Sequence, residues 1–189
     1  MELLEKRILA DGKVRPGGIL KVDSFLNHRI DPELMHEIAL ELKRLYGDCG
    51  VSKILTIEAS GIAMAVMAGY VFGCPVLFAK KSKSRNISDS VFSTEVESFT
   101  HGNTNTVIVS REYLGPNDKV LIIDDFLATG AALEGLISLC EQAGAEVAGC
   151  GIAVEKVFQG GGNALREKGI RVESLAMISS MTDDGIEFM

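Results

Sequence analysis

The sequence predicts an α/β fold, with a central, mainly parallel sheet flanked by helices. Strand-like apolar segments alternate with helix-like segments along most of the chain. Val120 to Ile123 is aliphatic at every position, as expected for a strand buried on both faces of a parallel sheet. With 189 residues, 47% of them hydrophobic, the chain can bury one sizeable core, so we expect a single domain over residues 1–189.

The expected elements follow one another in a regular order. Met1 to Ile8 is charged and amphipathic, which favours a first helix over a signal peptide. Asp31 and Pro32 precede apolar residues at three- and four-residue spacing, a pattern typical of a capped helix that ends at Gly47. The later expected elements are the strand Lys53 to Ile57, the helix Ile62 to Phe72, the strands Pro75 to Ala79 and Thr106 to Val109, the helix Gly130 to Ala143, the strand Glu146 to Val154, and the helix Asn163 to Lys168 after a flexible turn at Gly160, Gly161 and Gly162.

Composition excludes several classes of protein. A net charge of -7 opposes a general nucleic-acid binder, and no apolar run reaches the length needed to span a membrane. The four cysteines and three histidines lack the spacing of a metal site, so we expect reduced thiols and no protein-bound metal. These features predict a cytoplasmic protein that binds neither membrane nor nucleic acid.

One motif combines paired carboxylates with a small-residue turn. Asp124 and Asp125 follow the buried strand, at the sheet edge where ligands bind in parallel α/β proteins. The turn Ala128, Thr129, Gly130, Ala131, Ala132 then opens a helix. Free backbone N–H groups and the dipole at such a helix start bind phosphate, and small side chains allow its close approach. The motif therefore predicts a site for a sugar phosphate.

Two other structures could explain this motif, a magnesium site and a simple turn cap. A Walker-B-like magnesium site would also place acids after a buried strand, but the chain contains no G-x-x-x-x-G-K-[ST] loop. A simple cap of the turn between strand and helix would account for one carboxylate and a glycine. It leaves the second acid and Thr129 unexplained.

The order of apolar strand, two acids and Thr-Gly turn resembles the phosphoribosyl-diphosphate signature of the type I phosphoribosyltransferases. The resemblance implies that fold, with a small hood over about 1–30 and 155–189 and a mobile β-hairpin flap over about 80–105. It implies that a purine nitrogen displaces pyrophosphate from the ribose. Asp124 and Asp125 then act as the catalytic carboxylates on the ribose hydroxyls, and residues 128–132 bind the phosphate. No tightly bound cofactor is expected, and Mg²⁺ would travel with the diphosphate.

Two further segments match the resembling enzymes by position. Ala59, Ser60 and Gly61 lie where the family has its pyrophosphate loop, so Glu58 must point away from the diphosphate or bond a neighbouring amide. Such small residues before a helix are also common for packing reasons. Lys81 lies in a cationic stretch, residues 80–85, that is either a solvated charge run or part of the flap. We expect Lys81 to contact diphosphate, within its own subunit or across a dimer.

The resemblance implies that the hood carries the purine specificity. Residues 11–28 closely resemble the opening of the xanthine-specific bacterial branch of this family, and the resemblance extends over essentially the whole chain. It implies that Leu20 packs on the purine, Asn27 bonds its edge and Lys156 reaches an exocyclic oxygen. An oxopurine presents acceptors that need such donors, whereas adenine presents a donor at position 6. The implied reaction forms xanthosine 5′-monophosphate in purine salvage.

Two rival functions stay open on the sequence. A guanine and hypoxanthine phosphoribosyltransferase needs similar donors, because these purines share the 6-oxo group. A purine-sensing regulator needs a DNA-binding domain and a basic surface, neither of which is visible in the sequence. The small-residue helix Ile62 to Phe72 and a flap that crosses subunits would suit a homodimer, which we expect.

Overall fold

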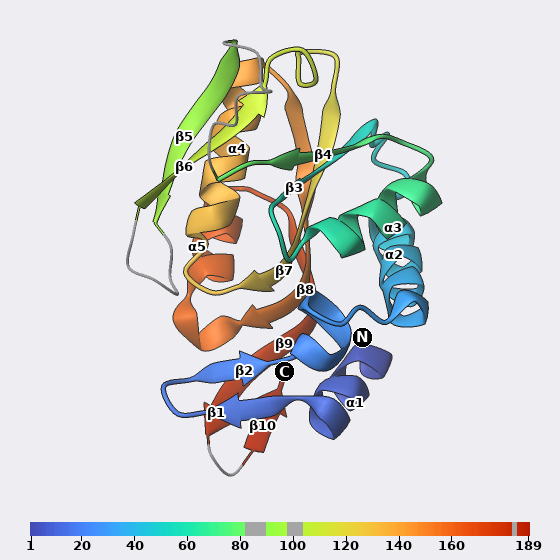
Figure 1. The fold of residues 1–189 in the computed structure, drawn as a ribbon, viewed down its shortest axis with the longest axis vertical. Helices are drawn as coiled ribbons and strands as arrows, with labels where there is room; N and C mark the ends of the chain where they lie inside the picture. Colours follow the sequence, from blue (N-terminus) through green and yellow to red (C-terminus); the bar gives the residue numbers. More distant parts are fainter. Residues whose placement is uncertain (82–89, 98–103, 183–184) are drawn as a thin grey trace.

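The computed structural model describes residues 1–81, 90–97, 104–182 and 185–189. A six-stranded sheet in the order β10-β9-β8-β7-β3-β4 forms its centre (Figure 1). Its strands are β3 (Lys53–Ile57), β4 (Val76–Ala79), β7 (Lys119–Leu127), β8 (Glu146–Lys156), β9 (Val172–Thr182) and β10 (Gly185–Phe188). All neighbouring pairs are parallel except β10 with β9. The predicted mainly parallel α/β fold is confirmed.

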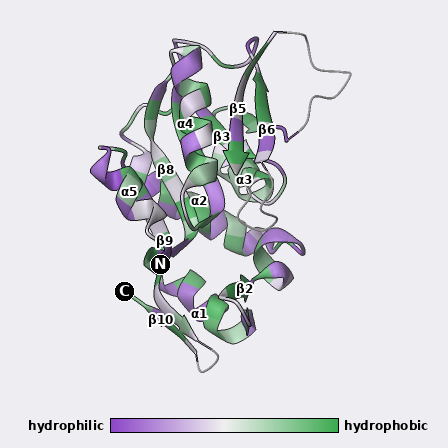
Figure 2. Ribbon diagram, turned by 90° about the vertical axis from the view of Figure 1, so that its left-hand side faces the viewer, coloured by the Kyte–Doolittle hydropathy of each residue, from purple (hydrophilic) through white to green (hydrophobic). Residues whose placement is uncertain are grey.

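Helices cover both faces of this sheet. α2 (Pro32–Tyr46) and α3 (Ile62–Phe72) pack on one face, while α4 (Ala131–Ala143) and α5 (Gly161–Glu167) pack on the other (Figure 1). Figure 2 shows hydrophobic and hydrophilic turns alternating along α4, as expected for a helix with one buried face. β7 serves both cores, because Leu121 and Ile123 join the α2/α3 side while Val120 and Ile122 join the α4 side. This double burial explains why the strand is aliphatic throughout.

The capped helix forms as the sequence predicts. The Asp31 carboxylate accepts a hydrogen bond from the Leu34 N–H at 3.2 Å, and Pro32 occupies the first turn. The helix ends at Tyr46, whose hydroxyl donates to the Cys150 carbonyl at 2.9 Å. This bond ties α2 to β8 in the middle of the sheet.

A hood lies beyond one end of the sheet. It comprises α1 (Glu2–Asp11), the short antiparallel pair β1 (Lys13–Arg15) and β2 (Ile19–Lys21), and the π-helical turn Asp23–Asn27, beside β10 and the end of β9 (Figure 1). Its buried apolar side chains belong to the same cluster as α2 and α3, and these are Leu4, Ile8, Leu20, Val22, Phe25 and Leu26. The hood therefore packs continuously onto the core, and the exact hood and flap boundaries stay predictions.

The structure corrects two expectations about secondary structure. The segment Thr106 to Val109 is not part of the central sheet. It lies in β6 (Thr104–Ser110), which pairs antiparallel with β5 (Val91–Glu97). Phe92 and Val96 of this ribbon are buried against α4, because their alternate positions present one apolar face. The predicted flap thus contains a hairpin of described strands, while residues 82–89 and 98–103, with most of the cationic stretch, lie outside the described residues.

The glycine run is the second correction. The expected flexible turn at Gly160, Gly161 and Gly162 is wrong, because α5 begins at Gly161 and both Gly161 and Gly162 are buried. A 3₁₀ turn, Val157–Gln159, links β8 to this helix. Within the described part of the chain, none of the helices has the length and apolar character needed to cross a membrane.

Candidate active site

A pocket of about 590 Å³ opens at the carboxyl ends of β3 and β7, beneath the hood. It brings together nearly all of the residues expected from the sequence to form the site. The lining includes Leu20, Asn27, Ser60, Lys81, Asp124, Asp125, Ala128, Thr129, Gly130, Ala131, Ala132 and Lys156. Ala59 and Gly61 are the two expected residues that are not part of the lining. The position agrees with the rule for ligand sites in parallel sheets.

The two carboxylates project from β7 itself. The expected strand end at Ile123 is wrong, since β7 continues to Leu127 and pairs with β8 beyond the acids. Asp124 and Asp125 are only 5% and 6% exposed. The Asp125 N–H donates to the Asp124 carboxylate at 3.0 Å. Sheet pairing therefore fixes the backbone of both acids.

Asp125 joins the other parts of the site. One of its carboxylate oxygens accepts from the Ser60 hydroxyl at 2.9 Å, and the other accepts from the Asn27 side-chain amide at 2.8 Å. Ser60 belongs to the loop after β3, and Asn27 ends the π-helical turn of the hood. One carboxylate thus contacts both the loop expected to bind pyrophosphate and a residue expected to bind purine.

Burial makes ionisation of Asp124 unfavourable. The pKa of Asp124 is raised well above its ordinary value, first because the carboxyl is removed from water and second because the Asp125 charge lies next to it. Lys81 opposes this shift through its positive charge. The pocket therefore suits a ligand that brings hydrogen-bond donors or positive charge to these carboxyls.

The small-residue turn adopts the geometry of a phosphate-binding helix start. Gly130 has φ 92°, a left-handed conformation that favours glycine, and it is the N-cap of α4. α4 begins at Ala131, one residue later than predicted, so the N–H groups of its first turn open toward the pocket that residues 128–132 line. The Thr129 hydroxyl adds a polar group at the same wall.

The loop after β3 is held by hydrogen bonds to the end of β4 and the residues after it. Glu58 accepts from the Lys81 backbone N–H at 2.6 Å, so it bonds a neighbouring amide, one of the two arrangements expected from the sequence. The peptide bond between Glu58 and Ala59 is cis. A Cβ on Gly61 would lie 2.1 Å from the Thr56 hydroxyl, so only glycine fits there. Ala59 and Gly61 therefore shape the loop, while Ser60 faces the pocket.

The hood supplies the remaining wall. Leu20 is buried in it, and the Lys156 ammonium donates to the Gly18 carbonyl at 2.9 Å. Burial lowers the pKa of Lys156 below its ordinary value. Phe126, whose ring centroid lies 5.7 Å from the ammonium, also lines the pocket. Sequence reasoning missed Phe126, although its place directly after the two acids was a usable signal.

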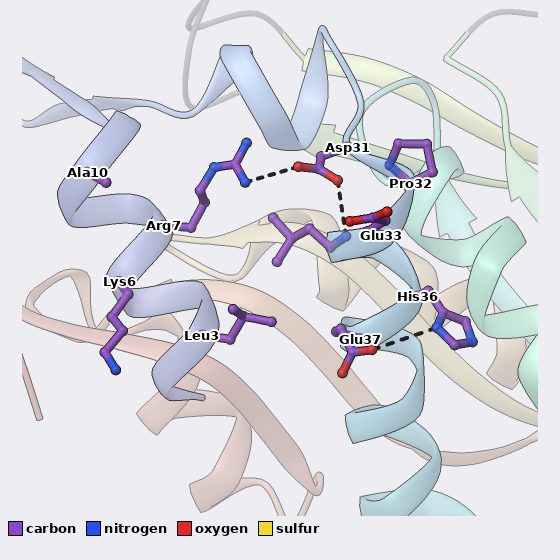
Figure 3. Close-up of a pocket in the computed structure, with 10 residues that line it drawn as sticks. Leu3, Lys6, Arg7, Ala10, Asp31, Pro32, Glu33, His36 and Glu37 are labelled. Atoms are coloured by element: carbon purple, nitrogen blue, oxygen red, sulfur yellow. Dashed lines mark hydrogen bonds and ion pairs between the residues drawn. The ribbon is translucent and has the colours of Figure 1, made fainter.

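A second hollow of about 700 Å³ lies between α1 and the start of α2 (Figure 3). Two pairs of side chains lie within it: Arg7 lies 3.0 Å from Asp31, and His36 lies 3.8 Å from Glu37. None of the expected site residues lines this hollow. Among the residues that the structure describes, no three histidine, cysteine, aspartate or glutamate side chains gather as a metal site.

Comparison with known proteins agrees with this arrangement. The family model for the phosphoribosyl transferase domain matches residues 29–168. The fold resembles adenine phosphoribosyltransferase from Trypanosoma brucei in complex with AMP, pyrophosphate and ribose-5-phosphate (TM-score 0.77, 17% identity, 96% of this chain and 82% of that chain). It also resembles the enzyme from Giardia lamblia (TM-score 0.76, 21% identity, 92% of this chain and 97% of that chain). The chain belongs to the phosphoribosyltransferase family.

Full-length relatives place it more closely within that family. Xanthine phosphoribosyltransferase from Finegoldia magna is 54% identical over 100% of this chain and 99% of the relative. The proteins of the same name from Lactobacillus delbrueckii subsp. bulgaricus and Bacillus cereus are 53% and 52% identical, each over 100% of this chain and over 100% and 96% of the relative. The resemblance stated from the sequence is confirmed.

Proposed function

We propose that this chain transfers the phosphoribosyl group of 5-phospho-α-D-ribose 1-diphosphate to xanthine, forming xanthosine 5′-monophosphate and pyrophosphate. The proposal rests on the name shared by its full-length relatives and on one observation about the site. Asp125 bonds Ser60 on one side and Asn27 on the other. A ribose held at this carboxylate would lie between a pyrophosphate-binding loop and a purine-binding hood, as the reaction requires.

Asp124 and Asp125 are the proposed catalytic residues. Departure of pyrophosphate leaves positive charge on the ribose ring, and carboxylates that bond the 2′- and 3′-hydroxyls stabilise that charge. Fixing both carboxyls on a sheet-paired strand keeps them oriented before the substrate arrives. The 5′-phosphate would occupy residues 128–132, where no side chain caps the start of α4.

The leaving diphosphate has two proposed contacts. The loop Ala59–Gly61 provides amide groups, and the Lys81 side chain lines the pocket of its own chain. The place of Lys81 in this lining favours action within the subunit. The family uses the magnesium complex of the sugar diphosphate, and the ion neutralises the diphosphate charge. With no carboxylate cage among the described residues, diphosphate and ribose oxygens would supply most of its ligands, beside Asp124 and Asp125.

Xanthine recognition is assigned to Leu20, Asn27 and Lys156. Lys156 presents a buried ammonium beside the Phe126 ring, which favours an acceptor oxygen and an anionic base. Its present partner, the Gly18 carbonyl, would be replaced by the purine oxygen. An exocyclic amino group at that place would leave the ammonium unpaired, so adenine is rejected.

A homodimer is part of the same proposal. α3 exposes Val66 and Tyr70, which are 55% and 81% accessible in the single chain. Large apolar side chains exposed along one helix are typical of a subunit interface. Size-exclusion chromatography with light scattering distinguishes a dimer from a monomer, and Tyr70→Glu should shift a dimer toward monomer.

The test is consumption of phosphoribosyl diphosphate with xanthine, guanine, hypoxanthine and adenine offered separately. The double variant Asp124→Asn/Asp125→Asn is compared with Asp48→Asn, an exposed aspartate remote from the site. Xanthine preference that is lost in the double variant alone supports the proposal. Preference for guanine or hypoxanthine would instead favour the rival salvage reaction, and binding of phosphoribosyl diphosphate without turnover of any purine would favour a regulator.

A further inference from the structure

The glycine run after β8 touches the phosphate-binding turn directly. The Gly161 N–H donates to the Ala128 carbonyl at 3.1 Å. A Cβ built on Gly161 would lie 2.4 Å from the Ala128 carbonyl oxygen, 2.4 Å from the Thr129 carbonyl carbon and 2.5 Å from the Gly130 nitrogen. All three are backbone atoms, which cannot rotate aside as a flexible side chain can.

The same contact is present from the side of Gly130, at a longer distance. A Cβ on Gly130 would meet the Gly161 Cα at 3.4 Å. Two glycines therefore face each other where the start of α5 reaches the turn before α4. Gly161 lies in the first turn of α5 and has no positive φ, so close approach alone explains why a side chain is excluded there.

The α5 segment is anchored from behind by a buried carboxylate. Glu155, 1% exposed, forms a two-point pair with the Arg166 guanidinium at 2.9 and 2.7 Å and also accepts from the Ser174 hydroxyl. Burial by itself would raise the pKa of Glu155, but the bonds from Arg166 and Ser174 outweigh it and lower that pKa. Arg166 also donates to the Val172 carbonyl at 3.2 Å.

Packing completes the anchor. Leu165 of α5 is 1% exposed and belongs to the α4-side core. A Cβ on Gly162 would lie 1.9 Å from the Glu155 carboxylate, so the helix start is pressed onto this pair. With α5 held in this way, the phosphate turn is the part that must yield if the contact is crowded.

We infer that Gly161 is a positioning residue for the 5′-phosphate site, acting through the backbone of Ala128, Thr129 and Gly130 while the Glu155–Arg166 pair holds α5 in place. This inference rests on the proposed function, which assigns the 5′-phosphate to that turn. The expected ligand class is a phosphate monoester on a pentose. The three atoms nearest to a Cβ added on Gly161 all belong to this turn, so the effect is expected at one half of the sugar diphosphate.

The experiment compares two ligands by isothermal titration calorimetry: ribose 5-phosphate, which needs the turn, and inorganic pyrophosphate with Mg²⁺, which needs the other loop. Gly161→Ala should weaken ribose 5-phosphate at least tenfold and leave pyrophosphate within twofold. Arg166→Lys, which keeps the charge beside Glu155 but loses the two-point geometry, should show the same split at a few fold. It keeps the test available if Gly161→Ala fails to fold.

Two glycine controls separate positioning from general damage. Gly115→Ala meets nothing within 4 Å and should match wild type. Gly69 lies in α3, and a Cβ added there would meet the Val76 side chain of β4 at 2.3 Å. Gly69→Ala should therefore lower the unfolding temperature without the split between ligands. The inference would be overturned if Gly161→Ala left the affinity for ribose 5-phosphate unchanged or lowered the affinity for both ligands equally. In either case, turnover by the wild-type protein would leave the proposed function intact. A wild-type protein that binds neither ligand and turns over no purine would instead remove the proposed function.

Discussion

The ribose-phosphate half and the purine half of the pocket are built in different ways. The first lies on one continuous stretch, residues 124–132, whose backbone is fixed by pairing of β7 with β8 and by the start of α4. The second depends on single side-chain contacts between distant segments. Asn27 and Asp125 are 98 residues apart, and Lys156 and Gly18 are 138 residues apart. The difference fits the proposed function, in which the first half performs chemistry common to all bases and the second half selects the base.

The largest effect is expected from the ribose-phosphate half. Asp125→Asn keeps the shape of the side chain but removes the charge that stabilises the ribose transition state. We expect kcat to fall by about 10²–10³. Because the reaction of every purine uses the same sugar diphosphate, the factor should be the same within about threefold for each purine that is turned over. Steady-state kinetics with each purine measure it, beside Asp48→Asn as control.

A selective loss for one purine would break this comparison. It would mean that Asp125 also contributes to base recognition, through its hydrogen bond with Asn27. Such coupling would show as a change in the ratio of kcat/KM between purines in Asp125→Asn that is absent in Asp124→Asn.

An intermediate effect is expected from the purine half. Lys156→Met retains length and apolar bulk beside Phe126 but removes the only donor that this position offers to a purine oxygen. We expect kcat/KM for xanthine to fall by about 10–100-fold, with affinity for phosphoribosyl diphosphate unchanged. Lys168→Met is the matched control, because Lys168 forms an exposed ion pair with Glu134 that contributes little. Equal losses in the two variants would contradict the assignment of Lys156.

The same contrast explains which features the sequence alone predicted. The aliphatic strand, the two acids and the Thr129-Gly130 turn are neighbours in sequence, so their spacing reports their geometry. The positions of Leu20, Asn27 and Lys156 came from resemblance, because contacts across about a hundred residues leave no local pattern. Their roles in binding, like those of the other site residues, stay predictions.

The errors have physical causes as well. The sequence predicts a strand end at Ile123, because charged residues are unusual inside a buried strand. β7 nevertheless carries both acids within its paired length. The three glycines resembled a flexible turn, but two of them are small because α5 packs against backbone and against Glu155. The sequence does not predict the pairing of Glu155 with Arg166, since Arg166 lies 11 residues further along and on a different element.

The smallest effect concerns the contribution of the ribose-phosphate half to the stability of the fold. The folded protein raises the pKa of Asp124 above its ordinary value of 3.8, mainly by burial and then by the neighbouring Asp125 charge. The folded state therefore binds this proton more tightly than the unfolded state. The stabilising contribution is fully present below 3.8 and is lost as pH rises through the folded-state pKa. At neutral and alkaline pH, the Asp124 carboxylate is thus expected to destabilise the ligand-free fold.

Asp124→Asn removes this cost and keeps an oxygen that accepts from the Asp125 N–H. We expect its unfolding temperature at pH 8 to exceed that of wild type by about 2–4 °C, corresponding to about 1 kcal/mol, with the difference shrinking toward pH 4. Asp118→Asn provides a control of opposite sign, because Asp118 pairs with Lys53 at 2.7 Å and accepts from the Gly115 N–H at 2.9 Å. Calorimetry at several pH values measures both. If Asp124→Asn were less stable than wild type at pH 8, other interactions in the ligand-free protein would already offset the cost of burying the two carboxylates. A more stable but inactive variant would show that the ribose-phosphate half retains an unfavourable carboxyl because catalysis needs its charge.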